Sequence, residues 1–191
     1  MKLRAASALV LAGGRSSRFG RDKALAIFAG QALVTRAVEA AQAAFTQVAV
    51  VAKDPVRYAA QARGAALVAD GSDLVTPLAG LIAGLEWSPA EVVFVFAVDM
   101  PFAVDAALLD ALEAAIQGRD AAVPTCGGQP EPLCALFRKA PALQAGRALL
   151  ADQKGPSALL GALDAAWVDW PDRRPFLDAD TPDALADLGR R

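Results

Sequence analysis

Histidine is absent from the 191 residues of this chain. Its absence excludes every mechanism that requires imidazole, namely Ser-His-Asp hydrolysis, zinc sites ligated by histidine, and transfer through phosphohistidine. The chemistry that remains is carried out by carboxylates, cations, backbone dipoles and a hard metal ion.

Cysteine and long apolar runs are also scarce. Cys126 and Cys134 have no metal-type spacing and suggest no disulfide framework, so we expect both to be small buried apolar residues. No apolar stretch approaches the roughly 20 residues that span a bilayer. The start, Met1–Ala6, resembles a signal peptide, but removing the apolar segment behind it would destroy the first expected strand. We therefore expect a cytoplasmic protein that does not contact membranes.

Positive charge is concentrated in one loop near the start of the chain. The net charge is −2, so no overall basic field predicts nucleic acid as a partner. An apolar run ends in Gly13 and Gly14, and the loop that follows carries four cations: Arg15, Arg18, Arg21 and Lys23. Glycine lets backbone N–H groups converge on an anion, and nearby cations add charge-assisted hydrogen bonds.

The spacing in this loop is neither that of a Walker P-loop, which ends in Gly-Lys-Ser/Thr, nor that of the dinucleotide fingerprint. The whole string nevertheless predicts a site for a phosphorylated ligand, in particular a nucleoside triphosphate. The alternative is a strand-to-helix turn whose basic residues are solvated.

Strand-like apolar runs alternate with amphipathic stretches, which predicts a doubly wound α/β fold. We expect a three-layer, Rossmann-like α/β/α arrangement with a mostly parallel central sheet, in one domain spanning 1–191. Residues 1–117 form the expected nucleotide-binding half and 118–191 the acceptor half. The expected strands are Ser7–Leu11, Gln47–Ala52, Ala65–Ala69, Val92–Val98, Ala121–Pro124, Leu133–Phe137 and Ala166–Asp169. The expected helices are Leu33–Ala44, Pro55–Arg63, Pro77–Trp87 and Asp105–Gln117, with two short helices before the last strand.

Two aspartates follow expected strands at the edge of the sheet where ligands bind in open α/β folds. Asp99 comes directly after the apolar run Val92–Val98, and next to a triphosphate a lone carboxylate is suited to hold Mg²⁺. The alternative for Asp99 is a turn or helix cap before Pro101. Asp70 is predicted equally to contact a ribose hydroxyl or base edge, or to form a polar turn.

Taken in order along the chain, several short motifs resemble the molybdenum cofactor guanylyltransferase (MobA) family, within the wider nucleotidyltransferases. They are Leu11-Ala12-Gly13-Gly14, Gly20-x-x-Lys23, Pro77-Leu78-Ala79-Gly80, Asp99-Met100-Pro101, Pro132-Leu133 and Asp180-Thr181-Pro182. The first loop alone indicates the superfamily, and the later motifs narrow the resemblance.

The resemblance implies transfer of GMP from GTP to the terminal phosphate of molybdopterin, with release of pyrophosphate. It implies nucleotide contacts from Leu11, Ala12, Gly13, Gly14, Lys23, Asp70 and Asp99, and a magnesium ion on Asp99. The implied partners are molybdoenzymes or their chaperones, and we expect a monomer or a weak homo-oligomer. In the mechanism, Lys23 and Asp99, with Arg18 or Arg15, align the phosphates and neutralise their charge.

One departure from the family keeps other functions open. Members commonly have asparagine near the end of the second strand, whereas the best-aligned residue here, Val51, has no amide. A molybdopterin cytidylyltransferase is therefore the first alternative. Another nucleotidyltransferase acting on a phosphorylated small molecule, such as a sugar or lipid precursor, is the second. A nucleotide-binding regulatory module without turnover is the third.

Overall fold

A computed structural model describes residues 4–13, 22–179 and 181–188. Its centre is an eight-stranded sheet in the order β10-β7-β9-β6-β1-β4-β5, with β8 paired to β7. The strands are β1 (Arg4–Leu11), β4 (Phe45–Ala52), β5 (Ala66–Ala69), β6 (Val92–Ala97), β7 (Ala121–Cys126), β8 (Gln129–Pro130), β9 (Cys134–Arg138) and β10 (Ala165–Asp169). Among these strands, only β8 and β9 run against their neighbours. The expectation of a mostly parallel α/β sheet is confirmed.

The middle of the sheet is apolar because both of its faces are covered. β6 reads VVFVFA, and Val93–Phe96 are fully buried. A near-continuous apolar run is typical of a parallel strand packed on both sides. β1 pairs with β6 on one side and with β4 on the other, which places it in the interior of the sheet.

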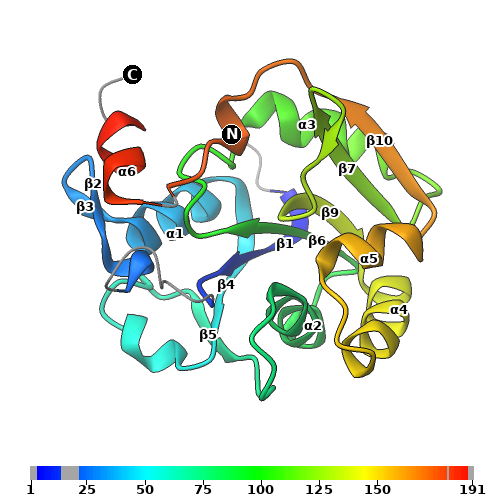
Figure 1. Cartoon of the computed structure of the whole chain (residues 1–191), viewed down its shortest axis with the longest axis horizontal. Helices are drawn as coiled ribbons and strands as arrows, with labels where there is room; N and C mark the ends of the chain where they lie inside the picture. The colour runs from blue at the N-terminus through cyan, green and yellow to red at the C-terminus, as the bar shows by residue number, and fades with distance from the viewer. Residues whose placement is uncertain (1–3, 14–21, 180, 189–191) are drawn as a thin grey trace.

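Helices form a layer on each face of the sheet, as Figure 1 shows. One apolar cluster lies beneath α1 (Leu33–Ala44) and α3 (Ala106–Ala115). The other lies beneath α2 (Pro77–Trp87), α4 (Lys139–Ala151) and α5 (Pro156–Gly161). α2 approaches the sheet so closely that a Cβ at Gly84 would lie 2.4 Å from Leu9 Cδ1. Glycine at this position is therefore a packing requirement.

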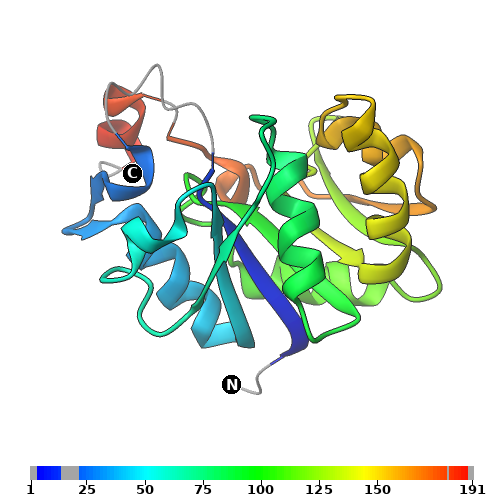
Figure 2. The ribbon, with the colours of Figure 1, turned by 90° about the horizontal axis from the view of Figure 1, so that it is seen from below.

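Short elements surround the edge where the parallel strands end. They are η1 (Lys23–Leu25), the hairpin β2 (Ile27–Phe28) and β3 (Gln31–Ala32), η2 (Pro55–Tyr58), η3 (Arg174–Phe176) and α6 (Pro182–Leu188). Figure 2 shows β1 running from the N-terminus toward the side on which η1 and α6 lie. Segments from both ends of the chain therefore meet at one edge of the sheet.

The predicted elements agree with the structure where the sequence pattern is strong. The helices Leu33–Ala44 and Pro77–Trp87 have the expected bounds. The predicted helix Pro55–Arg63 is wrong in extent, because only the 3₁₀ turn Pro55–Tyr58 forms. None of the helices in the described parts of the chain is both long and apolar enough to span a membrane.

Candidate active site

Loops at the ends of β1, β4, β5 and β6 build one continuous edge, because backbone hydrogen bonds continue beyond the strands. Ala12 N donates to Val51 O at 2.8 Å, and Asp70 N donates to Ala52 O at 3.0 Å. On the other side of β1, Val98 N donates to Leu11 O at 3.0 Å. Residues that follow β1, β5 and β6 are thereby held in fixed positions relative to one another and to β4.

Lys23 and Asp99 form an ion pair across this edge. Lys23 Nζ donates to Asp99 Oδ2, joining η1 to the loop that follows β6. The two side chains keep only 14% and 18% of their exposure, so the pair is largely shielded from solvent. The two residues that the sequence singled out for phosphate and metal chemistry are therefore in direct contact.

A second group of contacts holds the turn that carries Lys23. Asp22 caps η1 by accepting a hydrogen bond from Ala24 N at 3.1 Å. The hydroxyl of Tyr58 lies 3.0 and 3.2 Å from the two oxygens of this carboxylate, and Arg57 Nη2 lies 3.1 Å from Oδ2. We call Asp22, Arg57 and Tyr58 the Asp22 clamp. The clamp fixes the turn that presents Lys23 to Asp99.

Tyr58 is the only tyrosine of the chain and is buried, with 4% exposure. Burial raises the pKa of its hydroxyl far above the ordinary value, and the adjacent Asp22 carboxylate raises it further. The hydroxyl therefore remains protonated and donates to Asp22 over the whole physiological pH range.

A cavity of about 590 Å³ opens at the ends of β1, β4 and β5. This volume is within the range of small-molecule sites. Its lining residues are Ala12, Gly13, Asp22, Ala52, Lys53, Asp54, Arg57, Tyr58, Asp70, Val75, Thr76 and Pro77. Lys23 and Asp99 are not in this lining, but Asp22 is, and it immediately precedes Lys23. The cavity and the Lys23–Asp99 pair are thus neighbouring parts of one edge.

A second lysine–aspartate pair lies in the cavity wall. Lys53 Nζ lies 3.1 Å from Asp70 Oδ1 and also donates to Ser72 O. Asp70 Oδ1 further accepts from Ser72 N at 3.1 Å. Asp70 therefore forms the polar turn that was one of its two predicted roles, and it also lines the cavity; its contact with a nucleotide stays a prediction.

The backbone at Gly13 passes close to Asp70, but the packing of the protein does not require glycine at this position. A Cβ at Gly13 would lie 3.7 Å from Ala52 Cα and 3.9 Å from Asp70 Oδ2, which are ordinary contacts. It would, however, project beside the cavity that Gly13 lines. Glycine at this position leaves room for a ligand.

The groups around Asp99 suit Mg²⁺ better than they suit a metal ion whose ligands all come from the protein. Within the described residues no group of three or more His, Cys, Asp or Glu side chains is placed to hold a metal ion. Mg²⁺ is usually bound through one or two carboxylates together with substrate phosphates and water. A single strand-end carboxylate beside a cation agrees with that pattern.

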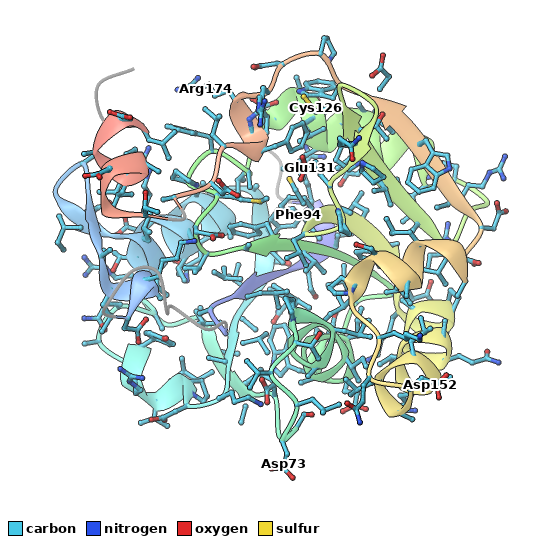
Figure 3. All side chains as sticks on the ribbon, viewed as in Figure 1. Asp73, Phe94, Cys126, Glu131, Asp152 and Arg174 are labelled. Atoms are coloured by element: carbon cyan, nitrogen blue, oxygen red, sulfur yellow. The ribbon has the colours of Figure 1, made fainter. Side chains whose placement is uncertain are left out.

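The acceptor half contributes its own groups to the same edge. Glu131, between β8 and β9, is half-buried, and burial raises its pKa, with the nearby Asp178 carboxylate adding to the shift. In the view of Figure 3, Glu131, Cys126 and Arg174 all lie on the same side of Phe94, the residue labelled near the centre of the sheet. The 173–179 segment is tied to this edge because Ala179 N donates to Asp99 O at 3.1 Å.

Leu11, predicted to contact the nucleotide through its backbone, and Val51 are not among the residues that line the cavity. They pair in adjacent strands, and their side chains are buried beneath α2. The contact from the Leu11 backbone to the nucleotide stays a prediction. Cys134 is buried as expected, whereas Cys126, also expected to be buried, is only half-buried.

The remaining predicted residues of the loop lie outside the described residues. They are Gly14, Arg15, Arg18 and Arg21, together with Asp180 near the C-terminus. Three basic residues after residue 118 make contacts within the protein: Arg138 donates to Arg119 O at 2.8 Å, Lys139 to Ser88 O at 2.6 Å, and Arg147 pairs with Glu86.

The sequence reasoning did not identify Lys53, Arg57, Tyr58 or Asp22 as site residues. The only signal available was the position of Lys53 directly after an expected strand, on the same edge as Asp70. The Asp22–Tyr58 contact joins residues 36 positions apart and has no local sequence signature.

Comparison with known proteins gives consistent results over nearly the whole chain. The model of the MobA-like NTP transferase domain matches residues 8–166. The molybdenum cofactor guanylyltransferase of Rhodopseudomonas palustris (strain BisB5) is 33% identical over 198 residues, covering 97% of this chain and 93% of that protein. A probable molybdenum cofactor guanylyltransferase of Chloroflexus aggregans is 34% identical over 194 residues, covering 94% and 91%.

Solved structures agree with these matches. The molybdopterin-guanine dinucleotide biosynthesis protein A of Archaeoglobus fulgidus superposes with a TM-score of 0.81 at 25% identity, covering 96% of this chain and 97% of that one. The 2-C-methyl-D-erythritol 4-phosphate cytidylyltransferase of Thermus thermophilus gives a TM-score of 0.69 at 18% identity, which shows a shared fold.

Proposed function

The chain belongs to the MobA-like NTP transferase family, and on that premise we propose that it is a molybdenum cofactor guanylyltransferase. It transfers GMP from GTP to molybdopterin and releases pyrophosphate. The observation that carries the proposal is the shielded Lys23–Asp99 pair beside a nucleotide-sized cavity, on a chain that matches such enzymes almost from end to end.

The residues suit a reaction between two phosphates. The acceptor phosphate is already ionised at neutral pH, so a site without histidine needs little help from a general base. The remaining task is to align the reacting groups and to neutralise the charge that develops on the leaving pyrophosphate. Lys23 supplies a fixed positive charge for this purpose, and the Asp22 clamp keeps it in place.

Asp99 is the residue that would hold Mg²⁺, and Lys23 lies beside it in an ion pair. When bound, the metal ion neutralises phosphate oxygens. We assign nucleotide contacts to Ala12, Gly13 and Asp70 around the cavity, with Gly14 and Arg18 from the adjoining loop as further candidates.

In this proposal the chain acts as one domain and as a monomer or weak homo-oligomer. The half up to residue 117 holds the nucleotide, and the half from 118 receives the acceptor. The loops before β9 and after β10 reach the same edge as Asp99, which supports this division. Molybdoenzymes or their chaperones would receive the product.

The test is a pyrophosphate-release assay with molybdopterin, Mg²⁺ and each of the four nucleoside triphosphates in turn. The proposal predicts turnover with GTP and much less with the other three. Turnover with CTP alone would establish a cytidylyltransferase instead, and GTP binding without any release of pyrophosphate would establish a binding module.

A further inference from the structure

We propose that Lys53 is the residue that selects a purine with an oxygen at position 6. The inference rests on the proposed function, because it assigns a specificity-determining residue to the nucleotide site of the same enzyme. Lys53 follows β4 and belongs to none of the motifs that the sequence identified.

The strand order gives the direction in which a nucleotide lies. Along the edge the strands follow one another as β6, β1, β4 and β5, and Asp99, Gly13, Lys53 and Asp70 lie just beyond their respective ends. Neighbouring strands are about 4.8 Å apart, so β6 and β4 are separated by about 10 Å. That separation suits an extended nucleotide with its phosphates at Lys23 and Asp99 and its base over β4.

Charge in the cavity wall also favours the base at this end. Three carboxylates, Asp22, Asp54 and Asp70, line the cavity against two cations, Lys53 and Arg57. A triphosphate is repelled by such a wall, whereas a neutral base with several hydrogen-bonding groups is accommodated. Exposed Val75, at 51%, adds apolar surface at the cavity.

The ammonium group of Lys53 is oriented and has one donor to spare. It has three N–H donors, and it contacts two acceptors, Asp70 Oδ1 and Ser72 O. No other acceptor among the described residues contacts it, and the side chain retains 40% of its exposure. The third N–H is therefore available to a ligand in the cavity, while the nearly buried Asp70 fixes the head of the side chain.

A lysine ammonium donates hydrogen bonds and accepts none. Guanine presents an acceptor oxygen at position 6, whereas adenine presents an amino group there. Lys53 thus binds the 6-oxo base and rejects the 6-amino base, because the latter leaves two donors facing each other. The selectivity that the buried Val51 cannot supply comes from the residue two positions later.

The experiment separates position 6 from the rest of the nucleotide. The dissociation constants of GTP, inosine triphosphate and 2-aminopurine riboside triphosphate are measured by calorimetry, without acceptor, for the parent protein and for Lys53→Met. Inosine triphosphate retains the oxygen at position 6 but lacks the 2-amino group, and the 2-aminopurine nucleotide has the reverse arrangement. Lys154→Met, at an exposed position in the acceptor half, is the matched control.

We expect Lys53→Met to weaken GTP and inosine triphosphate by about 10- to 100-fold, as for loss of a charged hydrogen bond, and to leave the 2-aminopurine nucleotide nearly unchanged. Lys53→Arg, which keeps charge and donors, should retain part of the preference, and Lys154→Met all of it. An equal loss for all three nucleotides would overturn the proposal and indicate a phosphate contact, and so would unchanged binding of GTP.

Failure of this inference can be distinguished from failure of the proposed function. A Lys53-dependent preference for the 6-oxo base, without pyrophosphate release in the presence of molybdopterin, would refute the guanylyltransferase and leave the role of Lys53 standing. Turnover with GTP that is unaffected in Lys53→Met would leave the guanylyltransferase standing and refute the role of Lys53.

Discussion

Two lysine–aspartate pairs lie on the same edge of the sheet, yet their surroundings differ. Lys23 and Asp99 are both shielded, and the lysine is supported by the Asp22 clamp. In the other pair Asp70 retains only 6% exposure, but Lys53 retains 40% and lines an open cavity. The same chemical pair is therefore rigid and enclosed at β6, but accessible at β4.

The difference separates two tasks. An enclosed charge pair in a poorly solvated place exerts a strong field and is suited to a reaction in which charge develops. An accessible lysine held at one end by a carboxylate is suited to recognition, because it can donate to a ligand without being displaced. Mutations at the first pair should therefore change turnover, and mutations at the second should change nucleotide preference.

The largest effect is expected from Asp99→Asn. The substitution keeps the shape of the side chain but removes the charge that would hold Mg²⁺, so turnover should fall by roughly 10²-fold or more. Thermal unfolding should change little, and it serves as the control for folding. Full activity at saturating magnesium would remove Asp99 from the mechanism and make the two pairs equivalent.

Lys23→Ala should follow, with losses of about 10- to 100-fold in both GTP affinity and turnover, because the charge faces the phosphates in the ground state and in the transition state. Calorimetry gives the affinity and pyrophosphate release the turnover. Lys53→Met provides the contrast, because its loss of nucleotide affinity should depend on the base of the nucleotide. Unchanged GTP affinity in Lys23→Ala would mean that Lys23 does not touch the nucleotide.

Gly13→Ala should weaken GTP binding by about 10-fold without lowering the free energy of unfolding. The added methyl group meets only ordinary contacts in the protein but occupies space beside the cavity. Gly84→Ala provides the opposite control, because its methyl group overlaps Leu9 and should cost about 1–3 kcal/mol of stability. Equal destabilisation by both substitutions would show that Gly13 is also a packing glycine.

Tyr58→Phe tests whether the enclosed pair depends on the Asp22 clamp. Loss of the hydroxyl should cost about 1 kcal/mol of stability and lower kcat/KM by roughly 3- to 10-fold, since Arg57 still holds Asp22. The preference for GTP over the 2-aminopurine nucleotide should not change. A change in that preference would mean that the clamp serves the cavity rather than Lys23.

The smallest effect is the pH dependence of stability that Tyr58 causes. Its pKa is raised in the folded protein, so above the ordinary value of 10.0 the folded state binds more protons than the unfolded state, and stability falls as the pH rises. Because the chain has one tyrosine and its three tryptophans do not ionise, the change in ultraviolet absorption on formation of tyrosinate reports this group alone. Tyr58→Phe should lack this loss of stability, and titration near pH 10 in the folded protein would contradict the buried hydroxyl.

Much of the sheet and two helices could be predicted because their signals are local. α2 begins with Thr76, whose side chain accepts from Leu78 N, and with a proline in the first turn, which together mark a helix start. The apolar runs of β1 and β6 identified the centre of the sheet. The two-residue strands β2, β3 and β8 are too short for any periodic pattern, and α4 was expected to be short although it extends over 13 residues.

The candidate site was predictable in part for a similar reason. Gly13, Asp70 and Asp99 directly follow apolar strands, so their place at one edge follows from the alternation of strands and helices. Tyr58 and Asp22 meet only because η2 and η1 pack together in three dimensions. Lys53 is oriented by Asp70, which follows the neighbouring strand. The sequence of a single strand does not indicate this contact.

The hydrogen bond from Ala179 to the carbonyl of Asp99 has a consequence for synthesis of the protein. On the ribosome, β1 and β6 emerge well before residue 179, so the loop that carries Asp99 lacks one of its supports until that residue has been made. A nascent chain that stops before residue 179 can form β1 and β6 yet lacks this support. Formation of these strands alone therefore does not complete the surroundings of Asp99.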